Sequence, residues 1–261
     1  MIAAELHPRH ERAADYDQEW VKAHLEAERR SADLLSEVRE AVFGAQDGLT
    51  SVLAVVSTVG GATHEPFPVL VAGLAATLAG VFSMAAGEYM SSKSQREIFE
   101  AQIATEATEV QERPAEAEAE VAFLLQEEGL ARAAAFRVAH ELASSRPVLL
   151  KTMVEKELGL VAEGDGHALR GALVMGASFG LAALVPILPY LLLPVGLAIY
   201  ASVACAGLAL FAMGVVKSRW TRRRWWSSGL EIFLLGAFAG LAGYVFGTFL
   251  PGLLGVAGVE G

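Results

Sequence analysis

Five long apolar runs, separated by charged stretches, set the pattern of this chain. A transmembrane helix needs about 20 predominantly apolar residues. Runs of that length predict membrane spans at residues 41–62, 66–92, 168–188, 191–216 and 225–250. The third and fourth spans come from one run, which carries a single charge at Arg170 and is broken by Pro186, Pro189 and Pro194. We therefore expect an all-α polytopic membrane protein with five transmembrane helices.

The polar stretches predict helices as well. Residues 1–40 should form a cytosolic N-terminal helix that begins near Tyr16. No Pro or Gly separates Ser92 from Glu112, so the second span should continue as one long helix until Pro114 ends it. Three shorter helices should follow, at residues 115–128, 131–144 and 147–158.

This pattern divides the chain into five parts. The part between spans two and three holds 15 of the 30 acidic residues, which predicts an acidic helical domain. The parts are the N-terminal helix at 1–40, a transmembrane hairpin at 41–92, the acidic domain at 93–167, spans three to five at 168–250 and a C-terminal tail at 251–261.

Composition narrows the class of protein. A hydrophobic fraction of 54% and a mean hydropathy of +0.42 fit a small membrane protein. The net charge of -10 argues against nucleic acid as a partner. Cys205 is the one cysteine, which excludes an internal disulfide and a thiolate metal cluster. The sequence has no Ser/His/Asp set, nucleotide motif or His-rich cluster, so we expect neither an enzyme nor a prosthetic group.

Positive charges predict the orientation. Residues 217–224 carry five Lys and Arg residues, and the positive-inside rule places such a loop in the cytosol. Counting back through the spans puts the N-terminus and the acidic domain in the cytosol too, and leaves the C-terminus outside. The turns at 62–66 and 188–191 have no Lys or Arg, as the outer side should.

Asp47 is the only charge in the first apolar run. A charge at the centre of a bilayer costs about 2.5–3.5 kcal/mol on insertion scales, and it usually marks a functional site. Met84 and Glu88 share a face of the second span, and the three residues should lie about 9, 12 and 6 Å from the cytosolic ends of their spans. Two carboxylates and a thioether suit Fe²⁺ better than Ca²⁺ or Mg²⁺.

Each of these three residues also has a plain structural explanation. Asp47 could make a buried hydrogen bond, Met84 could fill the core, and Glu88 could extend to the interface.

Three pairs of candidate metal ligands share helix faces in the acidic domain. They are Glu106 with Glu109, Glu116 with Glu120, and Met153 with Glu157. Packed together, the three faces would make an oxygen-rich site with one sulfur, and like-charge repulsion would destabilise it without a cation. The alternative is a solvated acidic surface.

Small residues form two stripes on the predicted spans. Gly73, Gly80 and Gly87 recur every seven residues, and four glycines at 236, 240, 243 and 247 line the fifth span. Such stripes let helices approach closely. Packing within one chain and a seam between two copies are equally open at this point.

Four segments together resemble the vacuolar iron transporter family, whose bacterial members lie in the inner membrane. They are FGAQDGLTS at 43–51, SMAAGEY at 83–89, the acidic insertion at 93–160 and ELGL at 157–160. The resemblance covers about residues 38–250. It implies a homodimer that exports Fe²⁺ or Mn²⁺, as substrate, from the cytosol in exchange for protons, along a path between the first spans of the two copies.

The resemblance also assigns roles to residues. Asp47 and Met84 match the family's membrane ligands. The matches in the acidic domain are Glu106, Glu109, Glu120, Met153 and Glu157, while Glu116 matches if the turn at Pro114 differs in length. The alternative function is a membrane-anchored metal sensor or storage protein that does not transport. Such a protein needs no charge in the membrane, so Asp47 and Glu88 argue against it.

Overall fold

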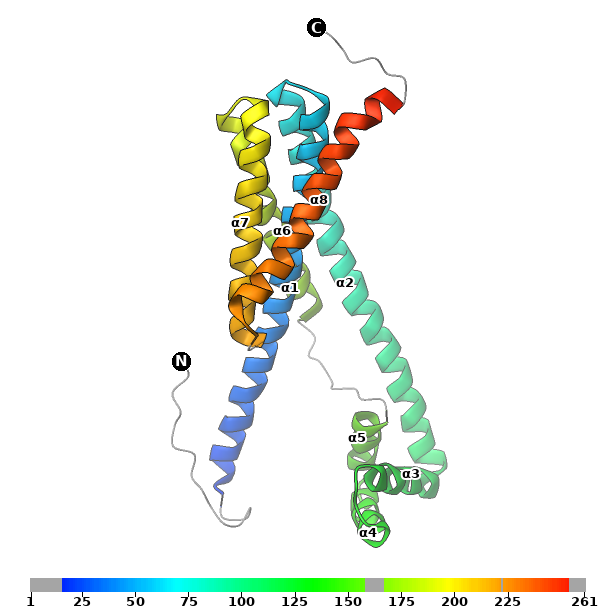
Figure 1. Ribbon diagram of the computed structural model, residues 1–261. Coiled ribbons are helices and arrows are strands. Elements are labelled where there is room, and N and C mark those ends of the chain that lie inside the picture. The colour runs from blue at the N-terminus through cyan, green and yellow to red at the C-terminus, as the bar shows by residue number, and fades with distance from the viewer. Residues whose placement is uncertain (1–15, 158–166, 222, 254–261) are drawn as a thin grey trace. The chain divides into compact units, whose positions relative to one another are not determined.

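The computed structural model describes residues 16–157, 167–221 and 223–253, and these are almost entirely helical (Figure 1). The helices are α1 Gln18–Ala62, α2 Pro66–Glu112, α3 Pro114–Glu127, α4 Arg132–Ala143, α5 Arg146–Lys156, α6 His167–Leu192, α7 Val195–Thr221 and α8 Trp225–Leu253. Five of them, α1, α2, α6, α7 and α8, are long and apolar enough to cross a membrane. The predicted fold class is confirmed, and the chain is a multi-pass membrane protein.

The two longest helices each join a polar segment to an apolar one. The N-terminal helix and the first span are one helix of 45 residues, capped by the Asp17 carboxylate, which accepts the N–H groups of Glu19 and Trp20 at 3.4 Å. α2 runs 47 residues without interruption and ends just before Pro114. The predicted continuation of the second span to Glu112 is confirmed.

The chain divides into two compact units. The membrane unit comprises Met1–Ala85 and Gly171–Gly261, and the acidic unit comprises Ala86–Arg170. α2 contributes its first part to the membrane unit and its second part to the acidic unit. Several predicted features lie outside the described residues: the end of the fourth polar helix at Leu158, the rest of the ELGL motif after Glu157, and most of the C-terminal tail.

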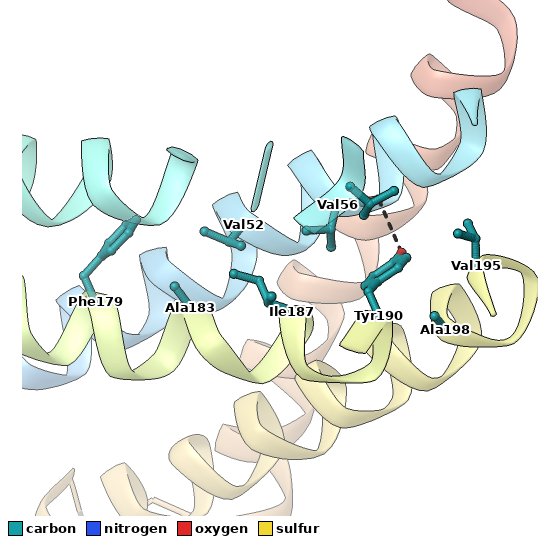
Figure 2. Packing of buried hydrophobic residues seen from close by; sticks show 9 residues of the cluster. Val52, Val56, Phe179, Ala183, Ile187, Tyr190, Val195 and Ala198 are labelled. Carbon is teal, nitrogen blue, oxygen red and sulfur yellow. Dashed lines mark hydrogen bonds between the residues drawn. The ribbon is translucent and has the colours of Figure 1, made fainter. Parts of the chain in front are cut away.

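Apolar side chains from four helices build the larger core of the membrane unit. Figure 2 shows Val52 and Val56 of α1 beside Ile187 and Tyr190 of α6, where the Tyr190 hydroxyl donates to the Val56 carbonyl oxygen at 3.3 Å. The full set is Val52, Val56, Val69, Phe179, Ala183, Ile187, Tyr190, Val195 and Ala198. A second cluster joins α1 to α7 and α8 through Leu49, Leu53, Ala206, Leu210 and Ile232.

The break between the third and fourth spans lies later than predicted. The expected spans ended at 188 and began at 191, but α6 continues to Leu192 and α7 begins at Val195. Pro186 and Pro189 therefore lie inside a helix, and Pro194 stands at the break. The carbonyl of Pro194 accepts the N–H groups of Leu197 and Ala198 at 2.9 Å, so this residue closes the first turn of α7.

α6 contains two internal prolines, and α7 donates a side-chain hydrogen bond to α6 beside them. A proline has no N–H, so each leaves a carbonyl one turn earlier without its helical donor. The Ser202 hydroxyl of α7 donates to the carbonyl oxygen of Pro186 at 2.7 Å, and both residues are buried. This bond ties α7 to the proline-containing part of α6.

Most of the predicted glycine stripes pack within the chain. A Cβ would meet another helix at Gly73, Gly80, Gly236, Gly240 and Gly243. Gly80 lies against the Phe179 ring, and Gly243 lies against the backbone of Ala54. At Gly87, nothing among the described residues lies within 4 Å of that position. For these five glycines, the structure favours packing within the chain.

The acidic unit has its own apolar core. It draws on α2, α3, α4 and α5 through Val110, Ala117, Val121, Ala122, Leu125, Ala135, Ala139, Leu149 and Met153. α3 stops at the predicted place, where Gly129 adopts φ 103°, a left-handed conformation that favours glycine. Leu130 then donates back to the Leu125 carbonyl oxygen at 3.0 Å, which closes the helix end.

Candidate metal site and transport residues

Asp47 lies on a segment of α1 that packs tightly against α6. A Cβ at Gly44 would overlap the carbonyl oxygen of Met175, and one at Gly48 would overlap that of Phe179. The two helices are therefore in backbone contact on either side of Asp47. The Asp47 side chain is half-buried, and the Ser51 hydroxyl donates to the Asp47 carbonyl oxygen at 2.6 Å.

Met84 lies near the same level of the membrane unit. It is half-buried and packs against the larger core. Along α6, Phe179 lies against both Gly48 of α1 and Gly80 of α2, so residues close to these glycines lie at similar heights. Gly176 and Gly180 of α6 lie against Ala85 and Val81 of α2, so Asp47 and Met84 lie at a similar level along α6.

Glu88 is half-buried and follows Met84 by one turn of α2. Its carboxylate accepts a hydrogen bond from the Ser92 hydroxyl at 2.8 Å. This bond holds the side chain along α2.

Three carboxylates meet at the corner between α2 and α3. One oxygen from each of Glu109, Glu116 and Glu120 lies within 4.8 Å of the others. The corner brings them together because the Arg113 N–H donates to the Glu109 carbonyl at 2.7 Å, while the Arg113 carbonyl accepts the Glu116 N–H at 3.0 Å. A tight turn thus places the end of one helix beside the start of the next.

Two further carboxylates belong to the same electrostatic environment. Burial raises the pKa of Glu120, and the negative charges of Glu109, Glu157, Glu116 and Glu106 raise it further. Burial also raises the pKa of Glu106, with smaller contributions from Glu157 and Glu109. Five predicted ligands therefore repel one another, and a bound cation would relieve that repulsion.

The predicted pair of ligands on α5 is divided between the core and the surface. Met153 is fully buried in the core of the acidic unit, whereas the Glu157 carboxylate is exposed at the end of α5. Lys156 fixes this end, because its Nζ donates to both carboxylate oxygens of Glu128 at 2.7 and 2.6 Å. The structure thus brings Glu157 near the cluster and leaves the Met153 sulfur among apolar neighbours.

Arg113 is a residue that the sequence pattern did not single out. Its Nη1 donates to Glu116 Oε2 at 2.9 Å, and its Nη2 lies 3.5 Å from Glu109 Oε2. The spacing to these residues, four before and three after, is that of helical ion pairs. Pro114 interrupts the helix there, so the spacing alone did not indicate both contacts.

Comparison with known proteins identifies the family. A family model described as the VIT family matches residues 38–248. The chain belongs to the VIT family. The resemblance drawn from the motifs is therefore confirmed, and the match spans all five apolar helices together with the acidic insertion. VIT proteins form a transporter family, so this chain is not an enzyme.

Several VIT-family relatives resemble the chain over most of their length. It is 32% identical over 208 residues to a vacuolar iron transporter of Centaurea cyanus, which covers 79% of the chain and 85% of that protein. It is 31% identical over 232 residues to vacuolar iron transporter 1 of Eucalyptus grandis, with 88% and 92% covered. A vacuolar iron transporter of Plasmodium falciparum is 27% identical over 219 residues, with 80% of each chain covered.

Proposed function

We propose that this protein transports Fe²⁺, with Mn²⁺ as a second substrate, out of the cytosol in exchange for protons. Asp47 is the observation that carries the proposal. It is a half-buried carboxylate within an apolar helix of a VIT-family chain. A carboxylate binds either a proton or a metal ion, so the two compete for it, and that competition can couple their opposite movements. The names of the relatives support iron as the substrate.

We assign two stages to the path. The acidic unit collects the metal ion through Glu106, Glu109, Glu116, Glu120, Met153 and Glu157. Asp47, Met84 and Glu88 then receive it at the membrane entrance. The close carboxylates of the cluster and the similar level of Asp47 and Met84 along α6 support this assignment.

We further propose a homodimer in a bacterial inner membrane, with the N-terminus and the acidic unit in the cytosol. The charge of the loop at 217–224 supports the orientation. One face of α1 supports the dimer: Phe43 is 57% exposed, and the half-buried Asp47 and Ser51 follow it at one-turn intervals. A second copy of α1 on that face would place two Asp47 carboxylates along a shared path.

The alternative is a membrane-anchored metal sensor or storage protein. The carboxylate cluster alone would serve that role. A sensor or storage protein would not use Asp47, so the free-energy cost of placing this carboxylate in an apolar helix would have no functional explanation.

Flux into liposomes tests the proposal. The purified protein is reconstituted, a pH gradient is imposed, and Fe²⁺, Mn²⁺ and Ca²⁺ movements are followed separately. We expect Fe²⁺ and Mn²⁺ flux that moves protons the opposite way, with metal accumulating against its own gradient only while the pH gradient is present, and with little Ca²⁺ flux. Metal binding without any flux would favour the sensor or storage function.

A further inference from the structure

We infer that Arg113 is a displaceable counter-ion of the carboxylate cluster, which an incoming divalent cation must replace. This inference rests on the proposed function, because it assumes that Glu109, Glu116 and Glu120 bind metal. According to this inference, a side chain of the protein competes with the cation for the carboxylates. The cation concentration at which the site fills would then depend on Arg113 as well as on the ligands.

The contacts of Arg113 involve two of the carboxylates that would hold a metal. Its guanidinium reaches Glu116 Oε2 at 2.9 Å and Glu109 Oε2 at 3.5 Å, and both carboxylates belong to the group within 4.8 Å. A guanidinium presents several N–H donors in a plane, which suits two carboxylates at once. Metal and guanidinium therefore compete for the same two carboxylates.

The backbone of Arg113 is held by hydrogen bonds, whereas its side chain is largely exposed to solvent. Its N–H and carbonyl are both used at the corner between α2 and α3. The side chain is 56% exposed, and ion pairs in such a setting are weak. A divalent cation held by several carboxylates can therefore displace the guanidinium without disturbing the corner.

The surface beside the corner offers room for the displaced group. An open hollow of about 410 Å³ is lined by Ala104, Thr105, Thr108, Glu109, Glu112 and Arg113. Glu112 is exposed and does not belong to the group of three carboxylates. It offers the guanidinium a new partner one residue away.

Metal binding to a pair of charge-matched variants tests the inference. Arg113→Gln removes the counter-ion, and Arg137→Gln removes an exposed positive charge on α4 of the same unit. Mn²⁺ binding to the full-length protein in detergent is measured by titration calorimetry. We expect Arg113→Gln to bind Mn²⁺ about fivefold more tightly than wild type, and Arg137→Gln to stay within about twofold. Arg113→Lys should fall between, because a single ammonium replaces the planar fork.

The outcomes separate this inference from the proposed function. Equal or weaker Mn²⁺ binding by Arg113→Gln, relative to Arg137→Gln, would overturn the counter-ion role while leaving the metal site in place. Wild-type protein that binds no Mn²⁺ would overturn the site and the inference together. If Arg113→Gln does not fold, Arg113→Lys decides, since affinity at or below the wild-type level would contradict displacement.

Discussion

At the scale of single residues, Asp47 and the glycines around it differ in how far the sequence reveals them. One charge in an apolar run is conspicuous, so Asp47 could be predicted as a functional residue. Gly44 and Gly48 bring α1 into backbone contact with α6 beside it. Their role could not be predicted, because a glycine on a helix does not indicate which helix it will meet.

Gly48→Ala should destabilise the protein, because the added methyl group would overlap the Phe179 carbonyl oxygen. Overpacking of this kind costs about 1–3 kcal/mol. Gly87→Ala is the matched control, since that site is open among the described residues and alanine favours a helix by roughly 0.5–1 kcal/mol. Thermal unfolding in one detergent compares the two variants. Equal melting temperatures would contradict the close approach of α1 and α6.

The raised pKa values of Glu106 and Glu120 predict how stability depends on pH. Both lie above the ordinary value of 4.5, so the folded protein holds these protons more tightly than the unfolded chain does. Their stabilising contribution is complete below about pH 4.5 and is lost as the pH rises through the raised values. With a chelator present, the melting temperature should therefore fall as the pH rises above about 4.5.

Replacing both residues by glutamine should flatten this fall, because neither side chain then titrates. Glu127→Gln with Glu141→Gln, two exposed positions of the same unit, should leave the slope near that of wild type. The same slope in both double variants would contradict the shared electrostatic environment of the cluster.

At the scale of elements, the helices could be predicted well and their junctions less well. The uninterrupted α2 follows from the lack of Pro and Gly between Ser92 and Glu112. The end of α6 was placed too early because a proline near the end of a helix forfeits a hydrogen bond without forcing a turn. The sequence also does not show that Ser202, which is distant along the chain, donates a hydrogen bond to this part of α6.

Loss of the hydroxyl should lower the stability of the protein at one buried serine but not at another. Ser202→Ala removes the hydrogen bond to Pro186 and should destabilise the protein by about 0.6 kcal/mol, the average for such bonds in membranes. Ser57 is fully buried, and its hydroxyl has no hydrogen-bond partner among the described residues. Ser57→Ala should therefore be neutral or stabilising. Thermal unfolding measures both, and a larger loss at Ser57 would contradict the proposed support of α6.

At the candidate metal site, too, the junction between helices α2 and α3 was harder to predict than the helices themselves. Helical spacing predicted that Glu116 and Glu120 share a face, and that Glu106 and Glu109 share another. It could not show that Glu116 meets Glu109, because that contact depends on the turn at Arg113. For the same reason, the pairing of Arg113 with both carboxylates was not predicted.

At the scale of the whole molecule, one chain combines an apolar bundle and an acidic helical unit, joined through the continuous α2. Membership of the VIT family extends over both. The hydrophobic pattern alone was sufficient for the number of spans and for the class of protein. The proposed function requires carboxylates in the acidic unit and in the first span to act one after the other, and a transport measurement tests this requirement.

Proton-driven Fe²⁺ flux in liposomes that contain the Asp47→Asn variant tests the central claim most directly. Asparagine keeps the size of the side chain and removes its charge, so the fold should persist. Glu26→Gln, on an exposed part of α1, is the control for loss of one carboxylate from the same helix. We predict that Asp47→Asn reduces the flux to that of liposomes without protein, while Glu26→Gln keeps the wild-type rate. Wild-type flux in a folded Asp47→Asn protein would contradict the account.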